Sequence, residues 1–339
     1  MNIIVDAFGG DNAPVEIIKG AELARKDLAI DITLVGKEDV IKKVCSDNEI
    51  NVDNFTVVHA DEVIETDAAG TDVARSGKNT SMAVGLKLLA DGKGDGFLSA
   101  GNSGAVCAGG TLIVKRIKGI SRPGFSPVIP TLGGKALLMD SGANLQCRPE
   151  MLCQFGIMGS IYMNKVLGVE NPRVGLLNVG TEEHKGSDLQ HEAYELLKKA
   201  PINFIGNVEG TFINGDVCDV VVCDGFSGNI LLKTYEGTAM ALMKKIKGIF
   251  TKNLKNKLAA GLVMSDVKEL KDSMNPSEVG GAPVLGCAKP VFKAHGNSDA
   301  RAIYSALKLV KDYVQNNVVE EIASTLKMMK PSEEVRTND

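Results

Sequence analysis

The feature that most constrains the fold of this chain is a recurring unit: a short apolar segment, a polar loop rich in glycine, and a helical pattern of apolar residues. In the clearest copy, Phe97 and Leu98 end the apolar segment, Gly101-Asn102-Ser103-Gly104 forms the loop, and the helical pattern runs from Ala105 to Val114. Alternation of strands and helices is typical of an α/β fold with a largely parallel sheet. Glycine lets such a loop bring backbone N–H groups close to an anion.

The same unit recurs along the chain. Strands are predicted at these segments: Ile3 to Val5, Ile32 to Val35, Phe55 to Val58, Ala136 to Met139, Val174 to Val179 and Val220 to Val222. At least five strands end in polar loops, at 6–14, 99–105, 140–144, 180–186 and 223–229, and two more loops are expected at 280–283 and 294–298. Ligands of open α/β sheets bind beyond the carboxyl ends of the strands. The sequence therefore predicts one large polar cleft.

Several helices and one crossing segment are also predicted. A long apolar helix opens at Arg148-Pro149-Glu150, Ser187 caps the next helix, another begins at Ile230, and Ala300 to Val314 closes the fold. The proline-rich segment 122–131 is expected to be a hinge or a loop at the edge of a lobe.

Composition narrows the class of protein. A chain of 339 residues is too long for one hydrophobic core, so two lobes are expected. The net charge is 38 − 42 = −4, which does not favour a nucleic-acid partner. Seven cysteines without a C-x-x-C pair predict reduced thiols in the cytoplasm. No apolar run approaches the roughly 18 residues of a membrane-spanning helix, and residues 331–339 are expected to be disordered.

Common site motifs are absent from the sequence. It contains no G-x-G-x-x-G, no G-x-x-x-x-G-K-[ST] and no H-E-x-x-H. A dinucleotide fingerprint, a P-loop and a zinc-protease site therefore have no support. Acidic residues at strand ends, such as Asp6 and Asp224, are interpreted as braces of the loops, and no metal or cofactor is expected.

Taken together, the loops resemble those of the PlsX-type phosphate acyltransferases, which transfer a fatty acyl group from acyl carrier protein to inorganic phosphate. The matching segments are Asp6 to Asp11, Ser99 to Ala105, Gly142 to Asn144, Leu177 to Gly186, Gly206 to Gly210, Cys223 to Asn229 and His295-Gly296. They follow one another over almost the whole chain. The sequence departs from the usual family residues at Phe8, Asn12, Ser103 and Ser141. Asn12 puts an acid–base role at that position in doubt, whereas Ser103 keeps the hydroxyl.

The resemblance implies a two-lobed, three-layer α/β/α fold like that of phosphate acetyltransferases and isocitrate or isopropylmalate dehydrogenases, usually as a homodimer. Residues 1–104 and 280–330 would form the first lobe and residues 105–279 the second. The enzyme would form acyl-phosphate for phospholipid synthesis and pass it to a membrane glycerol-3-phosphate acyltransferase. Two alternatives stay open: an NAD-dependent decarboxylating hydroxy-acid dehydrogenase on the same fold, and a non-catalytic docking scaffold for acyl carrier protein or membrane.

The reaction defines what the site must supply. Phosphate attacks a thioester carbonyl, so the site must hold an anion, stabilise a tetrahedral oxyanion at about 3–4 kcal/mol per donor, and release a thiol. Lys185 is expected to bind phosphate, unless it is a solvated partner of Glu182 or Glu183. His295 is expected to protonate the leaving thiolate, unless it is structural, and His184 could do the same. A nucleophilic Cys107 or Cys223 is a rival mechanism.

The remaining candidates come from the glycine-rich loops. Asn102 and Asn229 are expected near the reacting carbonyl. Phosphate and substrate are expected to contact these residues: Asp6, Gly9, Gly10, Ser99, Gly101, Ser103, Gly104, Gly180, Thr181, Asp224, Gly225 and Ser227.

An amphipathic helical hairpin is predicted over 240–273, with its tip at Leu258 to Met264 and a second helix capped by Ser265-Asp266. An apolar tip flanked by lysines is typical of an interfacial membrane contact. The contact residues would be Lys252, Lys255, Leu258, Leu262 and Val263. We therefore expect a cytoplasmic protein that associates peripherally with an anionic membrane surface, at the inner face of the cell membrane. The same lysines could receive acidic acyl carrier protein, and the apolar face could instead pack on the lobe or on a second subunit.

Overall fold

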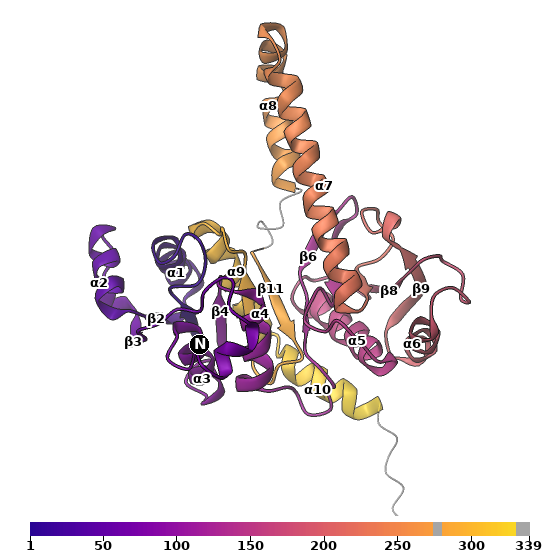
Figure 1. The fold of residues 1–339 in the computed structure, drawn as a ribbon, viewed down its shortest axis with the longest axis horizontal. Helices are drawn as coiled ribbons and strands as arrows, with labels where there is room; N and C mark the ends of the chain where they lie inside the picture. Colours follow the sequence, from indigo (N-terminus) through magenta and orange to yellow (C-terminus); the bar gives the residue numbers. More distant parts are fainter. Residues whose placement is uncertain (274–279, 330–339) are drawn as a thin grey trace, which may run out of the picture.

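The computed structural model describes residues 1–273 and 280–329, and their strands form two sheets (Figure 1). The first sheet has seven strands, in the order β3 (Thr56–His59), β2 (Asp31–Gly36), β1 (Asn2–Asp6), β4 (Gly96–Ser99), β12 (Val291–Ala294), β11 (Gly281–Leu285) and β5 (Gly124–Phe125). The first five strands are parallel, and β11 runs antiparallel to both of its neighbours. In the middle of the sheet, Val5 pairs with Leu34 on one side and with Leu98 on the other.

The second sheet has five strands, in the order β6 (Val128–Thr131), β7 (Gly134–Met139), β10 (Val220–Val222), β8 (Arg173–Asn178) and β9 (Asn203–Glu209). All are parallel except β6, which forms a hairpin with β7. The parallel strands of each sheet therefore end at one edge, as the recurring sequence unit predicts.

Helices cover both faces of each sheet. On the first sheet, α1 (Val15–Leu28) and α9 (Ala300–Gln315) pack on one face, and α3 (Ser81–Ala90) and α4 (Ser103–Gly109) pack on the other. Successive β1 residues alternate between these two cores, with Ile3 and Val5 in the α1–α9 core and Ile4 in the α3–α4 core. On the second sheet, α5 (Pro149–Lys165) and α6 (Asp188–Lys199) lie opposite α7 (Gly225–Thr251). The predicted three-layer α/β/α architecture is confirmed.

The remaining helices lie outside the main layers, and the last of them links the two lobes. Beyond the main layers lie α2 (Glu38–Asp47), the short helices η1 (Val52–Asn54), η2 (Gly70–Ala74), η3 (Gly110–Val114) and η4 (Gly210–Phe212), and α10 (Val318–Met329). The last helix, α10, packs against α5, so the chain returns to the second lobe at its end. Tyr313 of α9 contacts Phe292 of β12 and Tyr162 of α5, with ring centroids 5.4 and 6.2 Å apart. The two lobes therefore share a continuous apolar core.

The chain crosses between the sheets at Ser126-Pro127. The segment 122–131, expected to be a hinge or a lobe-edge loop, contributes β5 to the first sheet and β6 to the second. The Ser126 amide donates to the Pro283 carbonyl at 3.1 Å, which ties the crossing to β11. Because α4 and η3 still pack on the first sheet, sheet membership places the crossing later than the expected boundary at residue 104.

Two local expectations were wrong, and one strand was not predicted. The helix expected from Ile230 begins at Gly225, because the Asp224 carboxylate accepts a bond from the Ser227 amide and caps it. The expected loop 280–283 is mostly strand β11, because Gly281 to Pro283 pair with Ala294 to Phe292. Strand β9 was not predicted at all, although Val208 is buried in the second sheet.

The helical hairpin exists, but its turn lies elsewhere. Helices α7 and α8 (Leu254–Ser273) reverse at Lys252-Asn253 and project from the body as an arm (Figure 1). The Asn253 side chain accepts from the Asn256 amide at 2.8 Å, and Asn256 Nδ2 donates to the Ile249 carbonyl at 2.7 Å. This asparagine pair caps both helices, so the predicted tip at 258–264 and the predicted cap at Ser265-Asp266 lie within α8.

No helix among the described residues combines the length and hydropathy needed to cross a bilayer. The expected disordered tail, 331–339, lies outside the described residues.

Candidate active site

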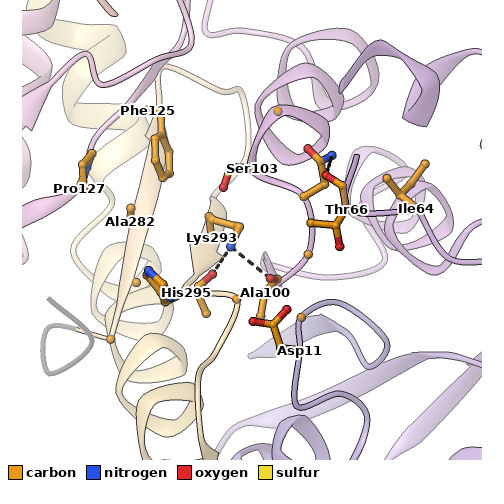
Figure 2. A pocket seen from close by; sticks show the side chains of 18 of the residues that line it. Asp11, Ile64, Thr66, Ala100, Ser103, Phe125, Pro127, Ala282, Lys293 and His295 are labelled. Atoms are coloured by element: carbon orange, nitrogen blue, oxygen red, sulfur yellow. Dashed lines mark hydrogen bonds between the residues drawn. The ribbon is translucent and has the colours of Figure 1, made fainter. Parts of the chain in front are cut away.

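A cavity of about 610 Å³ lies at the carboxyl ends of β1, β4 and β12 (Figure 2). First-lobe loops provide most of its wall: Gly10, Asp11, Val63 to Thr66, Ala100 to Gly104, Gly280 to Ala282 and Lys293 to Gly296. The crossing segment and α7 add the opposite side: Phe125, Pro127, Val128, Leu232, Lys233 and Glu236. The cavity therefore occupies the position at which α/β sheets bind ligands, between the first lobe and the segment that leads to the second.

The loops under the cavity are held by one buried carboxylate, Asp6 at the end of β1. Its oxygens accept from the hydroxyls of Ser81, at 2.6 Å, and Ser99, at 2.7 Å, and from the Phe8 amide at 3.2 Å. Ser99 Oγ in turn accepts from the Gly101 amide at 3.0 Å. Burial raises the pKa of Asp6, while the bonds from Ser81 and Ser99 oppose that rise. Asp6 and Ser99 thus brace the loop and do not line the cavity.

Glycine is required where the two first-lobe loops meet. A Cβ atom on Gly9 would lie 2.6 Å from the Gly101 amide nitrogen and 2.6 Å from Ser99 Oγ. The next residue, Gly10, lines the cavity with φ at +103°, a conformation that side chains disfavour. The loop after β1 therefore lies directly against the loop after β4.

Asn102 organises the mouth of the cavity. Its Oδ1 accepts from the Ala105 amide at 2.9 Å and caps α4. Its Nδ2 donates to the carbonyls of Thr66, at 2.9 Å, and Ala68, at 3.0 Å, and more weakly to that of Glu65. The side chain lines the cavity, yet its amide holds the 65–68 loop in place. Its geometry is that of a positioning residue, whereas the sequence suggested a direct role at the carbonyl.

A buried lysine on the floor of the cavity was missed. Lys293 of β12 is 7 % exposed, and its Nζ donates to the carbonyls of Ala100, at 3.2 Å, and Ala294. Burial lowers the pKa of Lys293 to about 8, while Cys107 and Asp11 act in the opposite direction. The sequence signal that could have found it is a lysine within the short apolar run Val291-Phe292-Lys293-Ala294.

His295, expected at the leaving group, lines the same cavity two residues after Lys293, and Figure 2 shows the two side chains near each other. In contrast to Lys293, its side chain is exposed. Six expected site residues thus line one cavity: Gly10, Gly101, Asn102, Ser103, Gly104 and His295.

The expected residues of the second lobe lie away from this cavity. Lys185, Gly180 and Thr181 belong to the loop after β8, and the other four, Asp224, Gly225, Ser227 and Asn229, surround the start of α7. The carboxylate of Asp224 accepts from both the amide and the hydroxyl of Ser227 at 2.9 Å. Gly225 donates its amide to the Asn144 carbonyl at 2.8 Å. These seven residues thus lie in strand-end loops of the second sheet, where the loop after β8 and the start of α7 each have their own hydrogen bonds.

Lys185 itself is half-buried in its loop. Its carbonyl accepts from Asn178 Nδ2 at 3.0 Å, and its aliphatic stem lies against Gly180. Glu183, considered as its partner, instead accepts from the Tyr194 hydroxyl at 2.8 Å and pairs with Lys198 at 3.5 Å.

The two cysteines considered as nucleophiles are buried thiols. Burial raises the pKa of Cys107 to about 12, and it also raises the pKa of Cys223. A thiol attacks a thioester as its thiolate, so neither residue is prepared for covalent catalysis.

The chain is similar to known proteins over nearly its whole length. Residues 1–321 match the model of a family described as "Fatty acid synthesis protein". A "Phosphate acyltransferase" of Thermoanaerobacter pseudethanolicus is 47% identical over 97% of this chain and 98% of its own length. A protein of the same name from Oceanobacillus iheyensis is 47% identical over 98% and 100%. Among solved structures, a phosphotransacetylase from Streptococcus pyogenes has a TM-score of 0.61 at 17% identity, over 93% of this chain and 94% of that one.

Proposed function

The chain belongs to the fatty acid synthesis protein family and is a phosphate acyltransferase, and from this premise we propose that acyl transfer takes place in the cavity over Lys293. The observation that carries the proposal is that polar groups and apolar side chains line the same cavity. Polar groups from Gly10, Asn102 and Lys293 lie along its first-lobe side. An anion and an apolar acyl thioester can therefore occupy it together.

The apolar side provides room for the acyl group. Phe125, Pro127 and Val128 come from the crossing segment, and Leu232 comes from α7. Val63 and Ile64 line the cavity from the loop after β3. Burying an acyl chain against such a surface is worth roughly 0.8 kcal/mol per methylene. Binding of the chain would fix the thioester carbonyl beside the polar floor, where phosphate is held.

The chemistry then needs few side chains. A phosphate oxygen attacks the carbonyl carbon, the carbonyl oxygen becomes negative in the tetrahedral intermediate, and the C–S bond breaks as acyl-phosphate forms. Donors placed around that oxygen stabilise the intermediate before it collapses. The acyl donor in this proposal is acyl carrier protein, and the product passes to a membrane glycerol-3-phosphate acyltransferase in phospholipid synthesis.

The dehydrogenase alternative has less support. A hydroxy-acid dehydrogenase on this fold would need an arginine-rich substrate site, and no arginine lines the cavity among the residues that the structure describes. The relatives that match nearly the full chain are named phosphate acyltransferases.

One assay separates the proposed function from its rivals. Purified protein is mixed with palmitoyl-acyl carrier protein, and the free carrier thiol is measured with and without phosphate. Thiol release that requires phosphate is the expected result. Release at the same rate without phosphate would reject the acyl transfer to phosphate, and hydroxy-acid-dependent reduction of NAD would favour the dehydrogenase.

We propose a further role for the α7–α8 arm in membrane contact. Large apolar side chains on it are exposed, including Leu254, Leu258 and Leu262, the last at 86 %. Lys252, at the turn, and Lys255, near it, are exposed too. Apolar side chains flanked by lysines are typical of an interfacial membrane contact, and the acidic carrier protein or a second subunit are the rival partners of the arm.

The membrane role predicts that a charge placed on the arm weakens binding to anionic membranes. Fully burying a leucine is worth about 2 kcal/mol, so Leu262→Glu should weaken partition onto anionic liposomes about 30-fold and leave acyl transfer in solution nearly unchanged. Leu132→Glu is the matched control, because Leu132 is 94 % exposed at the β6–β7 turn on the body. If Leu262→Glu still sediments with liposomes, the arm is not the anchor. Dissociation of a dimer in that variant would make the arm a subunit interface.

A further inference from the structure

Lys293 is set apart from the other charged residues of the cavity by its burial and its bonds. Lys233, on the α7 side, is 63 % exposed at its side chain and pairs with Glu236 at 2.8 Å. The Lys293 amine instead lies between the ends of β4 and β12, bound to the carbonyls of Ala100 and Ala294. Figure 2 shows both bonds and the His295 side chain beside them. A mobile surface lysine has no such fixed orientation.

The two carbonyls determine what this amine can offer to a substrate. A lysine ammonium has three N–H donors, and two of them are used by Ala100 and Ala294. One tetrahedral position is left for the cavity that Lys293 lines. That position holds a proton when the amine is charged and a lone pair when it is neutral. The carbonyl anchors keep it in one place in both states.

We propose that Lys293 is the acid that protonates the departing thiolate in the acyl transfer, an assignment that rests on the function proposed above. The phosphate dianion HPO₄²⁻ forms the new C–O bond, and the C–S bond breaks with its electron pair on sulfur. The free N–H of Lys293 delivers a proton to that sulfur. The neutral amine then takes the proton that the attached phosphate oxygen gives up. The sum is HPO₄²⁻ plus thioester giving acyl-phosphate dianion plus thiol, with Lys293 regenerated.

The surroundings of Lys293 suit this exchange. Burial and Lys233 on α7 disfavour the charged amine, whereas Asp11 in the loop after β1 and Asp6 on β1 favour it. Cys107 on α4 would favour it only as a thiolate, and burial raises the pKa of that thiol to about 12. Burial acts most strongly and lowers the pKa of Lys293 to about 8. An alkyl thiol has a pKa of about 8.5, so proton transfer between the two groups is nearly balanced. The donating form is lost as pH rises, so kcat should fall as pH passes about 8.

Two substitutions separate proton transfer from simple anion binding. Lys293→Met removes the proton and the charge, whereas Lys293→Arg keeps a charge that does not dissociate in this pH range. Both should lower kcat about 100-fold, the usual scale of general acid catalysis, and shift the phosphate KM less than threefold. A large rise in phosphate KM for Lys293→Met with normal turnover for Lys293→Arg would overturn the proposal in favour of anion binding. Circular dichroism and melting curves establish that each variant is folded.

The decisive measurement changes the leaving group. Wild type and Lys293→Met are compared on octanoyl thioesters of N-acetylcysteamine and of thiophenol, whose thiol is more acidic. A good leaving group needs no acid, so the deficit of the variant should shrink at least tenfold on the thiophenyl ester. An equal deficit on both esters would reject Lys293 as the acid, as would a leaving-group effect seen only for His295→Gln. Wild-type protein without phosphate-dependent release would instead reject the proposed function itself.

Discussion

Two clusters of strand-end loops, one on each sheet, have the same construction and different surroundings. The cluster of the first sheet is tied together by buried Asp6, and that of the second by buried Asp140 at the end of β7. Asp140 accepts from the amides of Asn144, at 2.7 Å, Ala143, at 3.2 Å, and Phe125, at 2.9 Å. The first cluster borders the cavity, whereas the second carries exposed apolar residues such as Val179 at 82 %.

This difference shows how the second lobe holds in place part of a cavity that the first lobe mainly forms. The hydrogen-bond donors to the Asp6 carboxylate, Phe8, Ser81 and Ser99, belong to the first lobe. Asp140, in contrast, holds Phe125, which is the last residue of β5 and part of the cavity wall. A strand-end loop of the second sheet thus fixes the apolar side of the cavity through the crossing segment. In both lobes a buried aspartate accepts hydrogen bonds from a loop. Asp6 braces a loop within the first lobe, whereas Asp140 joins its loop to the segment that connects the two lobes.

Among the substitutions that test the two clusters, Asp6→Ala is expected to have the largest effect on stability. The substitution leaves the hydroxyls of Ser81 and Ser99 and the Phe8 amide without their acceptor, and each unsatisfied buried donor costs about 1–3 kcal/mol. We expect a loss of at least about 3 kcal/mol in the free energy of unfolding, measured by urea denaturation. Exposed Asp91→Ala should stay within about 0.5 kcal/mol. A loss below 1 kcal/mol for Asp6→Ala would mean that the first cluster is held by other contacts.

A smaller effect is expected at Asn102, which positions the first cluster without charge. Asn102→Ala removes the cap of α4, at about 1 kcal/mol, and releases the 65–68 loop. The resulting misplacement should lower kcat about tenfold and change the phosphate KM less. Steady-state kinetics at several phosphate concentrations measures both constants. A rise in phosphate KM alone would mean that Asn102 contacts the phosphate.

The smallest effect tests whether the second cluster belongs to the site at all. Lys185 lies outside the cavity, so it can contact phosphate only if the loop after β8 moves toward the first lobe. We keep it as a proposed phosphate contact and expect Lys185→Ala to raise the phosphate KM about tenfold, the worth of one charge-assisted bond. Lys198→Ala, on the neighbouring α6, is the control. Unchanged kinetics at low phosphate would confine the site to the first cluster.

Local sequence signals predicted much of this fold. The units built around β1, β4, β7, β8 and β10 were predicted because an apolar strand, a polar loop and a helix follow one another within a few residues. The Ser187 cap was predicted for the same reason, and the structure shows a capping box with Gln190. Strand β5 could not be predicted, because its two residues are specified by pairing with distant β11. The hairpin turn was misplaced because two asparagines, rather than glycine or proline, end the helices.

The site was predicted only in part. Loops of one sheet share an edge, so Gly10, Gly101 and His295 could be expected together. Which sheet each loop belongs to, and how the lobes face each other, depends on packing between distant segments. Lys185 and Asn229 were therefore assigned to the same site as His295, although they lie in the other cluster. Lys293 was missed because the short apolar run around it was not predicted as a strand, and its burial depends on the place of that strand between β4 and β11.

The order of the strands has a consequence for synthesis on the ribosome. Strand β12 lies between β4 and β11 in the middle of the first sheet, yet it is encoded almost at the end of the chain. Until residue 294 has emerged, β4 is an open edge, while the second sheet, complete by residue 222, can already form. The nascent chain must therefore hold its first half unfinished while its middle folds. Because β12 also carries Lys293, a truncated product lacks both the closing strand and the buried amine.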